Sequence, residues 1–108
     1  MELRTLRYFL TTADEGNITR AAYILHVTQP TLSRQLMELE RELGAVLIVR
    51  GKKGISLTDD GMFFRQRAEE IVELADKTEK AFVERENTVS GIVSIGATEA
   101  VGRRLVAK

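Results

Sequence analysis

The stretch NITRAAYILHVTQPTLSRQL, residues 17–36, decides the fold of this chain. Its pattern predicts two short helices joined by a tight turn. Asn17 and Thr28 stand where the helices would begin, and short polar side chains at such places accept a hydrogen bond from a first-turn N–H. We therefore expect one helix from Thr19 to about Leu25 and a second that opens after Thr28, as in a helix-turn-helix.

The second of these helices has two different sides. Pro30 fits its first turn, where a missing N–H does no harm, and Gly44 is placed to end it. Apolar residues at helical spacing form an inner side, which comprises Leu32, Leu36, Leu39 and Leu43. The outer side is mostly polar and comprises Gln29, Pro30, Ser33, Arg34 and Met37.

The flanking residues complete a small helical core with a hairpin. A first helix is predicted before Gly16 from the spacing of Leu3, Leu6, Phe9, Leu10 and Ala13. Residues 46–49 and 55–57 are β-prone, and the basic, glycine-containing segment 50–54 between them predicts a hairpin tip. We expect a mainly α fold over residues 1–57, a winged helix-turn-helix of three helices and a two-stranded wing.

A single long helical pattern runs from Thr58 to about Glu86. Thr58 is a suitable N-cap, and Asp59 and Asp60 stabilise the positive end of the helix dipole. Seam residues alternate at four and three positions, as in a coiled coil: Phe64, Ala68, Ile71, Ala75, Thr78 and Phe82. Because so small a domain cannot cover both flanks of this helix, we predict that residues 58–86 pair with a second copy of the chain. A solvent-exposed connector is the alternative.

Residues 87–108 differ in pattern from the long helix. The run IVSI at 92–95 is typical of a strand, and one strand cannot form a sheet alone. We interpret this segment as a hinge and the first strand of a further domain, of which a shortened chain retains only the beginning.

Composition and charge narrow the classes of protein. Lys and Arg number 16, as do Asp and Glu, so the net charge is zero. Bases nevertheless outnumber acids between residues 20 and 53, which suits contact with a phosphate backbone, although two ordinary solvated surfaces would look the same. No apolar run approaches the roughly 18 residues of a membrane span. The absence of a secretion leader and of cysteine fits a cytoplasmic protein without a thiolate metal site, and no cofactor is expected.

The outer side of the second motif helix carries groups that read DNA. Such a helix fits the major groove, where Gln29 can pair with adenine and Arg34 with guanine or a phosphate. Helix N-termini and the basic hairpin would hold the backbone on either side. The candidate DNA contacts are Asn17, Thr19, Arg20, Thr28, Gln29, Pro30, Thr31, Ser33, Arg34, Arg50, Lys52 and Lys53.

Other interpretations remain open for these residues. Each alone is explained as a first-turn residue or a solvated cation, and their co-location favours DNA. The alternative is a winged-helix protein-interaction module with a coiled-coil assembly helix, although a docking face is usually richer in aromatic residues. An enzyme is not expected, because no nucleophile–base pair or metal cluster is present. His26 has a capping or packing role, and Glu69, Glu70 and Glu73 form a solvated face.

The chain resembles the LysR-type transcriptional regulators over nearly its whole length. The matching segments are LRYF (6–9), TRAA (19–22), LHVTQPTLSRQL (25–36), LERELG (39–44), LTDDG (57–61) and GIVSIG (91–96). The family usually has Ser-Phe at residues 17–18, an aromatic residue within 47–50 and alanine in place of Asp60. These departures affect the packing of the wing rather than the second motif helix, which carries the candidate base contacts and is called the reading helix.

The resemblance implies a winged helix-turn-helix that binds a partly palindromic operator in double-stranded DNA. It also implies a linker helix that pairs antiparallel in a homodimer, with tetramers in the full-length protein. A C-terminal domain would bind a small-molecule co-inducer and control activation or repression. In such proteins a hydroxyl residue just after the first effector strand often contacts the ligand, and Thr98 holds that place.

Overall fold

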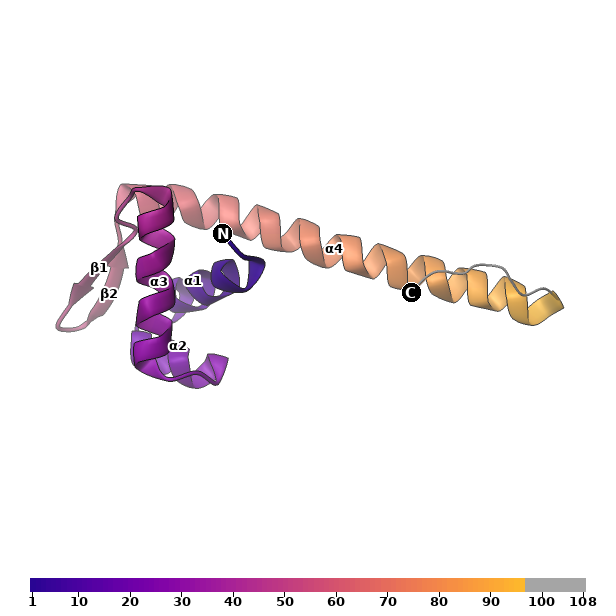
Figure 1. The fold of residues 1–108 in the computed structure, drawn as a ribbon, viewed down its shortest axis with the longest axis horizontal. Coiled ribbons are helices and arrows are strands. Elements are labelled where there is room, and N and C mark those ends of the chain that lie inside the picture. Colours follow the sequence, from indigo (N-terminus) through magenta and orange to yellow (C-terminus); the bar gives the residue numbers. More distant parts are fainter. Residues whose placement is uncertain (97–108) are drawn as a thin grey trace. The chain divides into compact units, whose positions relative to one another are not determined.

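The computed structural model describes residues 1–96, with side chains up to residue 85 (Figure 1). Its elements are α1 (Leu3–Glu15), α2 (Ile18–Leu25), α3 (Gln29–Leu43), β1 (Ile48–Gly51), β2 (Gly54–Leu57) and α4 (Asp59–Gly96). The chain divides into two units, Met1–Glu73 and Leu74–Lys108. The three helices and the antiparallel hairpin of the first unit confirm the predicted winged helix-turn-helix.

The core of the first unit lies where α1 packs against α2 and α3. Ala21 and Ala22 are buried, and their small side chains let α2 approach its neighbours closely. The other buried apolar residues are Leu6, Phe9, Ile18, Leu32, Leu36, Leu39, Leu47, Ile48, Phe64 and Ala68. The prediction for Leu43 was wrong, since this residue is 40% exposed. It lies in the last turn of α3, where the helix has passed the end of the core.

The helix ends form where the sequence places them. Gly16 and Gly44 end α1 and α3 in the left-handed conformation, with φ angles of 68° and 66°. His26 ends α2 in the same conformation, at φ 61°, and its N–H bonds to carbonyls of the preceding turn. A capping role for His26 is thereby confirmed. The start of α2 is Ile18, one residue earlier than predicted.

The wing is a tighter hairpin than the sequence suggests. Arg50 and Gly51 belong to β1, so the turn consists of residues 52–53, with Gly51 opposite Gly54 in the register. Both strands are fastened to the helices. A single Glu40 carboxylate oxygen accepts the N–H groups of residues 47 and 48, at 2.8 and 3.1 Å. On the other strand the Ile55 N–H donates to the carbonyl oxygen of Gly16 at 2.9 Å.

The first turns of α4 belong to the core of the first unit. Thr58 caps the helix, since its hydroxyl oxygen accepts the N–H of Gly61 at 2.9 Å. The rings of Phe9 and Phe64 meet edge to face, with centroids 5.1 Å apart and an interplanar angle of 74°. Arg65 forms an ion pair with Asp14 of α1. These contacts fix the start of α4 against α1.

Two expectations about the far part of α4 were wrong. The helix continues beyond Glu86 as far as Gly96, and residues 92–95 are helical rather than a strand. A strand needs a neighbouring strand to receive its hydrogen bonds, and the only sheet within residues 1–96 is the wing. A helix instead satisfies its N–H and C=O groups locally. No helix in the described part of the chain is long and apolar enough to span a membrane.

Candidate nucleic-acid interface

The turn between α2 and α3 is held by side-chain caps. The Asn17 carboxamide oxygen accepts the N–H of Arg20 at 2.8 Å, which fixes the first turn of α2. At α3 the Thr28 hydroxyl oxygen accepts the N–H of Thr31 at 3.2 Å and donates to the Thr31 hydroxyl at 2.8 Å. Asn17, Thr28 and Thr31 therefore have structural roles in the motif, whatever they contact beyond it.

Because of these caps, fewer N–H groups in the first turn of α3 are available to bind a DNA phosphate than the sequence suggested. The N–H of Thr31 is already bonded, that of Leu32 donates to the Thr28 carbonyl at 3.0 Å, and Pro30 has none. Only the N–H of Gln29 in this turn remains for an outside acceptor. The cap at Thr28 was predicted from the sequence, and its consequence is that the N–H of Thr31 is not available to a phosphate.

The outer side of α3 is presented to solvent as predicted. Gln29, Pro30, Arg34 and Met37 are exposed, and Ser33 is half-buried. The inner residues Leu32, Leu36 and Leu39 are at most 1% exposed, so α3 cannot rotate without opening the core. The exposed groups of the N-terminal half of α3 are thus held on a rigid element, as recognition of a groove requires.

The wing lies beside this side of α3. Arg50 donates through Nη1 to Ser33 Oγ at 3.1 Å, which joins β1 directly to the helix. Arg50, Lys52 and Lys53 are all exposed. We call the combined surface of Gln29, Pro30, Ser33 and Arg34 from α3 with Arg50, Lys52 and Lys53 from the wing the reading surface.

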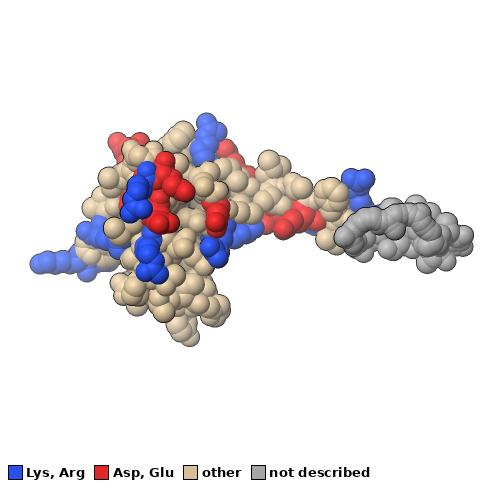
Figure 2. Space-filling model, viewed as in Figure 1, with Lys and Arg blue, Asp and Glu red and all other residues tan. Residues whose placement is uncertain are grey.

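The reading surface is basic, and ion pairs within the part of the chain that the structure describes do not neutralise its charges. Among the described residues, Arg34, Arg50, Lys52 and Lys53 form no ion pair, and the same holds for Arg20 in the first turn of α2. Elsewhere arginines are matched, as in Arg41–Glu38 at 3.8 Å and Arg67–Glu70 at 3.2 Å. Figure 2 shows Lys and Arg side chains extending from the tip of the wing. Cations left without partners on one face attract a polyanion.

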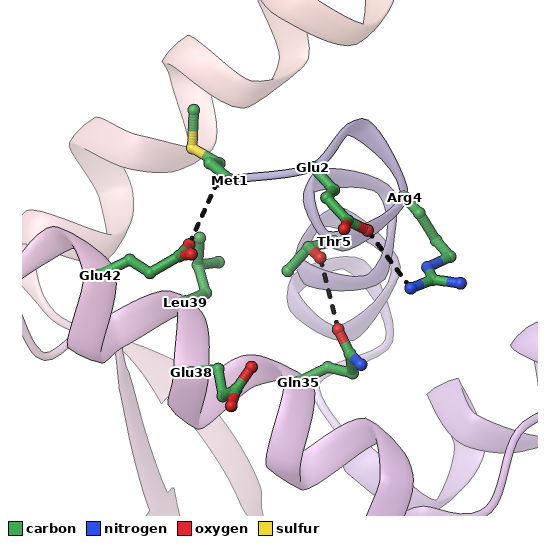
Figure 3. Close-up of a pocket in the computed structure, with 8 residues that line it drawn as sticks. All are labelled: Met1, Glu2, Arg4, Thr5, Gln35, Glu38, Leu39 and Glu42. Atoms are coloured by element: carbon green, nitrogen blue, oxygen red, sulfur yellow. Dashed lines mark hydrogen bonds and ion pairs between the residues drawn. The ribbon is translucent and has the colours of Figure 1, made fainter.

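A small hollow of about 170 Å³ lies on another side of α3, against the start of α1 (Figure 3). Its charged groups are already matched: the Met1 ammonium contacts Glu42 at 3.4 Å, and Arg4 contacts Glu2 at 3.3 Å. The acidic residues Glu38 and Glu42 line it from the C-terminal half of α3. Negative charge here disfavours a phosphate backbone, so this hollow does not extend the reading surface.

The predicted seam of α4 divides into two groups. Phe64 is 8% exposed and Ala68 is fully buried, both in the core of their own chain, so they are not available to a partner. The prediction for these two was wrong because the seam pattern does not distinguish an intramolecular from an intermolecular neighbour. Of the others, Ile71 and Phe82 are 40% and 61% exposed, Ala75 is half-buried, and Thr78 donates its hydroxyl to the Leu74 carbonyl at 2.7 Å.

Helix α4 carries further exposed apolar residues that were not among the predicted seam residues. Leu74 is 66% exposed and Val83 is 55% exposed. Leu74 precedes the seam residue Ala75 and Val83 follows the seam residue Phe82, and hydrophobicity alone could have found them. Thr98, the candidate effector contact, lies outside the described residues.

Comparisons with known proteins agree with this geometry. The family model described as bacterial regulatory helix-turn-helix protein, lysR family, matches residues 3–62. The chain is 46% identical over 99 residues to the HTH-type transcriptional regulator BsdA of Bacillus subtilis (strain 168), a match over 91% of this chain and 34% of that protein. BsdA is named a transcriptional regulator and not an enzyme, in agreement with the expectation from the sequence.

Solved structures of DNA complexes have the same fold. The structure of the BenM DBD with catB site 1 DNA matches with a TM-score of 0.77 at 40% identity, over 80% of this chain and 97% of that one. Full-length CbnR with its target DNA matches with a TM-score of 0.72 at 44% identity, over 75% of this chain and 28% of that one. The chain spans about a third of the length of the curated relatives that it matches.

Proposed function

Because this chain belongs to the lysR family of bacterial regulatory helix-turn-helix proteins, we propose that it binds double-stranded DNA and reads its sequence through α3. The observation that carries this proposal is the reading surface, in which polar groups on a rigid helix adjoin cations that have no ion-pair partner among residues 1–85. Phosphate contacts position a protein on the duplex, and contacts to base edges specify the sequence. The reading surface offers both kinds of group.

The charges along α3 orient it in the groove. Arg34 lies in the N-terminal half, whereas Glu38 and Glu42 lie in the C-terminal half. The N-terminal half therefore enters the major groove, as in other helix-turn-helix proteins. Gln29 then faces adenine and Arg34 faces guanine. The wing follows the backbone or the adjacent minor groove through Lys52 and Lys53, and α2 meets the backbone through Thr19 and Arg20.

The chain acts as a homodimer through α4. The exposed apolar residues Ile71, Leu74, Phe82 and Val83 support this, because water-exposed apolar side chains at helical spacing gain stability from a partner helix. A dimer presents two reading helices to two half-sites of a partly palindromic operator. The complete protein is a cytoplasmic regulator in which residues 87–108 lead into a domain for a small-molecule co-inducer, with Thr98 at its entry. In the complete protein, two dimers associate into a tetramer.

The test compares Arg34→Ala with the unchanged chain on two duplexes, one enriched by selection and one of random sequence. If Arg34 reads a base, the substitution costs about 1–3 kcal/mol on the enriched duplex and much less on the random one. Equal losses on both would make Arg34 a phosphate contact. Arg41→Ala is the control, because Arg41 lies in the C-terminal half of α3 and is paired with Glu38. Binding of neither duplex would favour a protein-docking module instead.

A further inference from the structure

The contact between Arg50 and Ser33 assigns these residues a joint role. Arg50 lies on β1, opposite Ile55 of β2, and its guanidinium reaches across to α3. The backbone around Arg50 is held at two places. Earlier in the same strand, the Ile48 N–H donates to the Glu40 carboxylate, and on the neighbouring strand the Ile55 N–H donates to the Gly16 carbonyl. The guanidinium is thus restrained at both ends of its side chain, which lowers the entropy lost when it binds a further group.

The polar groups of Arg50 and Ser33 that their mutual hydrogen bond does not use are mainly hydrogen-bond donors. A guanidinium has five N–H groups, and only one nitrogen of Arg50 is engaged with Ser33. No carboxylate among the described residues pairs with Arg50. Ser33 Oγ accepts from Arg50, so its own O–H remains free to donate outward. A cluster of donors with a positive charge fits an anionic oxygen.

The position of Arg50 and Ser33 indicates that they meet a backbone phosphate of the DNA rather than a base edge. Ser33 is half-buried beside the wing, whereas Gln29 and Arg34 are exposed in the N-terminal half of α3, the half that enters the groove. Lys52 and Lys53 follow Arg50 on the same hairpin. A guanidinium binds phosphate through two parallel N–H groups, and this requires that its plane be held.

We propose that Ser33 is a positioning residue rather than a base-reading one: it holds the Arg50 guanidinium so that Arg50 binds one DNA phosphate where α3 meets the wing. This inference rests on the proposed DNA binding. It makes the two residues a single unit, so that Ser33 matters only while Arg50 is present. It also makes their contribution independent of DNA sequence.

The test is a double-mutant cycle on a random-sequence duplex of about 30 base pairs, followed by fluorescence anisotropy over a range of salt concentrations. The variants are Ser33→Ala, Arg50→Ala and the two combined. Ser33→Thr retains the hydroxyl and serves as the conservative variant. Arg41→Ala is the matched arginine control, since Arg41 is 72% exposed and lies away from the reading surface.

Loss of Arg50 should weaken binding about tenfold and reduce the salt slope by about 0.9, the value for one phosphate contact. Loss of the Ser33 hydroxyl should weaken binding about threefold and reduce the slope in part, because the guanidinium is no longer held. The double variant should bind as Arg50→Ala does, within a factor of about two. Ser33→Thr and Arg41→Ala should behave as the unchanged chain.

Losses that multiply in the double variant would overturn the inference, because Ser33 would then act without Arg50. A Ser33→Ala effect confined to an enriched sequence would overturn it too, since Ser33 would be reading a base. Both results would leave the proposed DNA binding intact. An unchanged chain that fails to bind any duplex would instead overturn the proposed function and this inference with it.

Discussion

The Oε2 atom of Glu40 lies 2.8 Å from the backbone nitrogen of Leu47 and accepts its hydrogen bond. The same oxygen accepts the N–H of Ile48 at 3.1 Å. One side chain in the C-terminal half of α3 therefore fixes the beginning of β1. The distance between the reading helix and the wing is set by this contact inside the chain.

Replacing Glu40 with alanine should lower the free energy of unfolding by about 2–3 kcal/mol, because two partly buried N–H groups lose a charged acceptor. Glu40→Gln should cost less, since the amide oxygen still accepts. Urea denaturation followed by circular dichroism measures both. Glu38→Ala is the control, because this exposed side chain should change stability by no more than about 0.5 kcal/mol. Equal stability of the Glu40→Ala and Glu38→Ala variants would contradict the role given to Glu40.

Phe64 is a core residue of its own chain rather than part of a dimer seam. Phe64→Ala should therefore destabilise the fold by about 3–5 kcal/mol. The neighbouring Phe63, which is 60% exposed, provides the matched control, and Phe63→Ala should change stability far less. Both are measured by urea denaturation at several protein concentrations. If the loss of stability in Phe64→Ala disappeared at low protein concentration, Phe64 would belong to the dimer interface instead.

Gly61 should resist the substitution that usually stabilises a helix. Gly→Ala within a helix gains roughly 0.5–1 kcal/mol. At this position the added Cβ would lie 2.1 Å from the Leu47 carbonyl oxygen, so the start of α4 must move away from the residue that precedes β1. We expect a loss of about 1–3 kcal/mol in thermal denaturation. Gly51→Ala, whose nearest contact is an ordinary 3.6 Å, should be tolerated, and a gain in stability for Gly61→Ala would refute the close packing.

Phe82→Asp should weaken the proposed dimer. Phe82 is 61% exposed, and an aspartate at its position would bring two like charges into an apolar helix pair. Sedimentation equilibrium should show a shift towards monomer. Lys80→Asp makes a comparable change on the polar side of the helix and should leave the association unchanged. An undiminished dimer in Phe82→Asp would place the interface elsewhere.

Much of the fold follows from local rules that the sequence displays. The caps at Asn17, Thr28 and Thr58 and the glycine ends of α1 and α3 depend on only a few neighbouring residues, and all formed as predicted. The inner and outer sides of α3 also follow from spacing alone. The family motif therefore predicted the place of the reading helix correctly.

Other features depend on contacts between distant residues and could not be predicted from spacing. Thr12 is fully buried and its hydroxyl donates to the Tyr8 carbonyl at 2.8 Å, which satisfies this polar group inside the core. A search for apolar residues does not find it. Phe64 fits a coiled-coil seam equally well but meets Phe9 instead. The bond from Arg50 to Ser33 joins elements whose relative position no local pattern specifies.

The most direct measurement of the central claim is the selection of bound duplexes from a randomised pool at about 150 mM salt, where purely electrostatic binding is already weakened. Sequence reading by a dimer predicts an enriched site with two related half-sites. The Arg34→Ala variant should lose that enrichment, whereas Arg41→Ala should keep it. Uniform, salt-sensitive retention of all sequences, or no retention at all, would contradict the account.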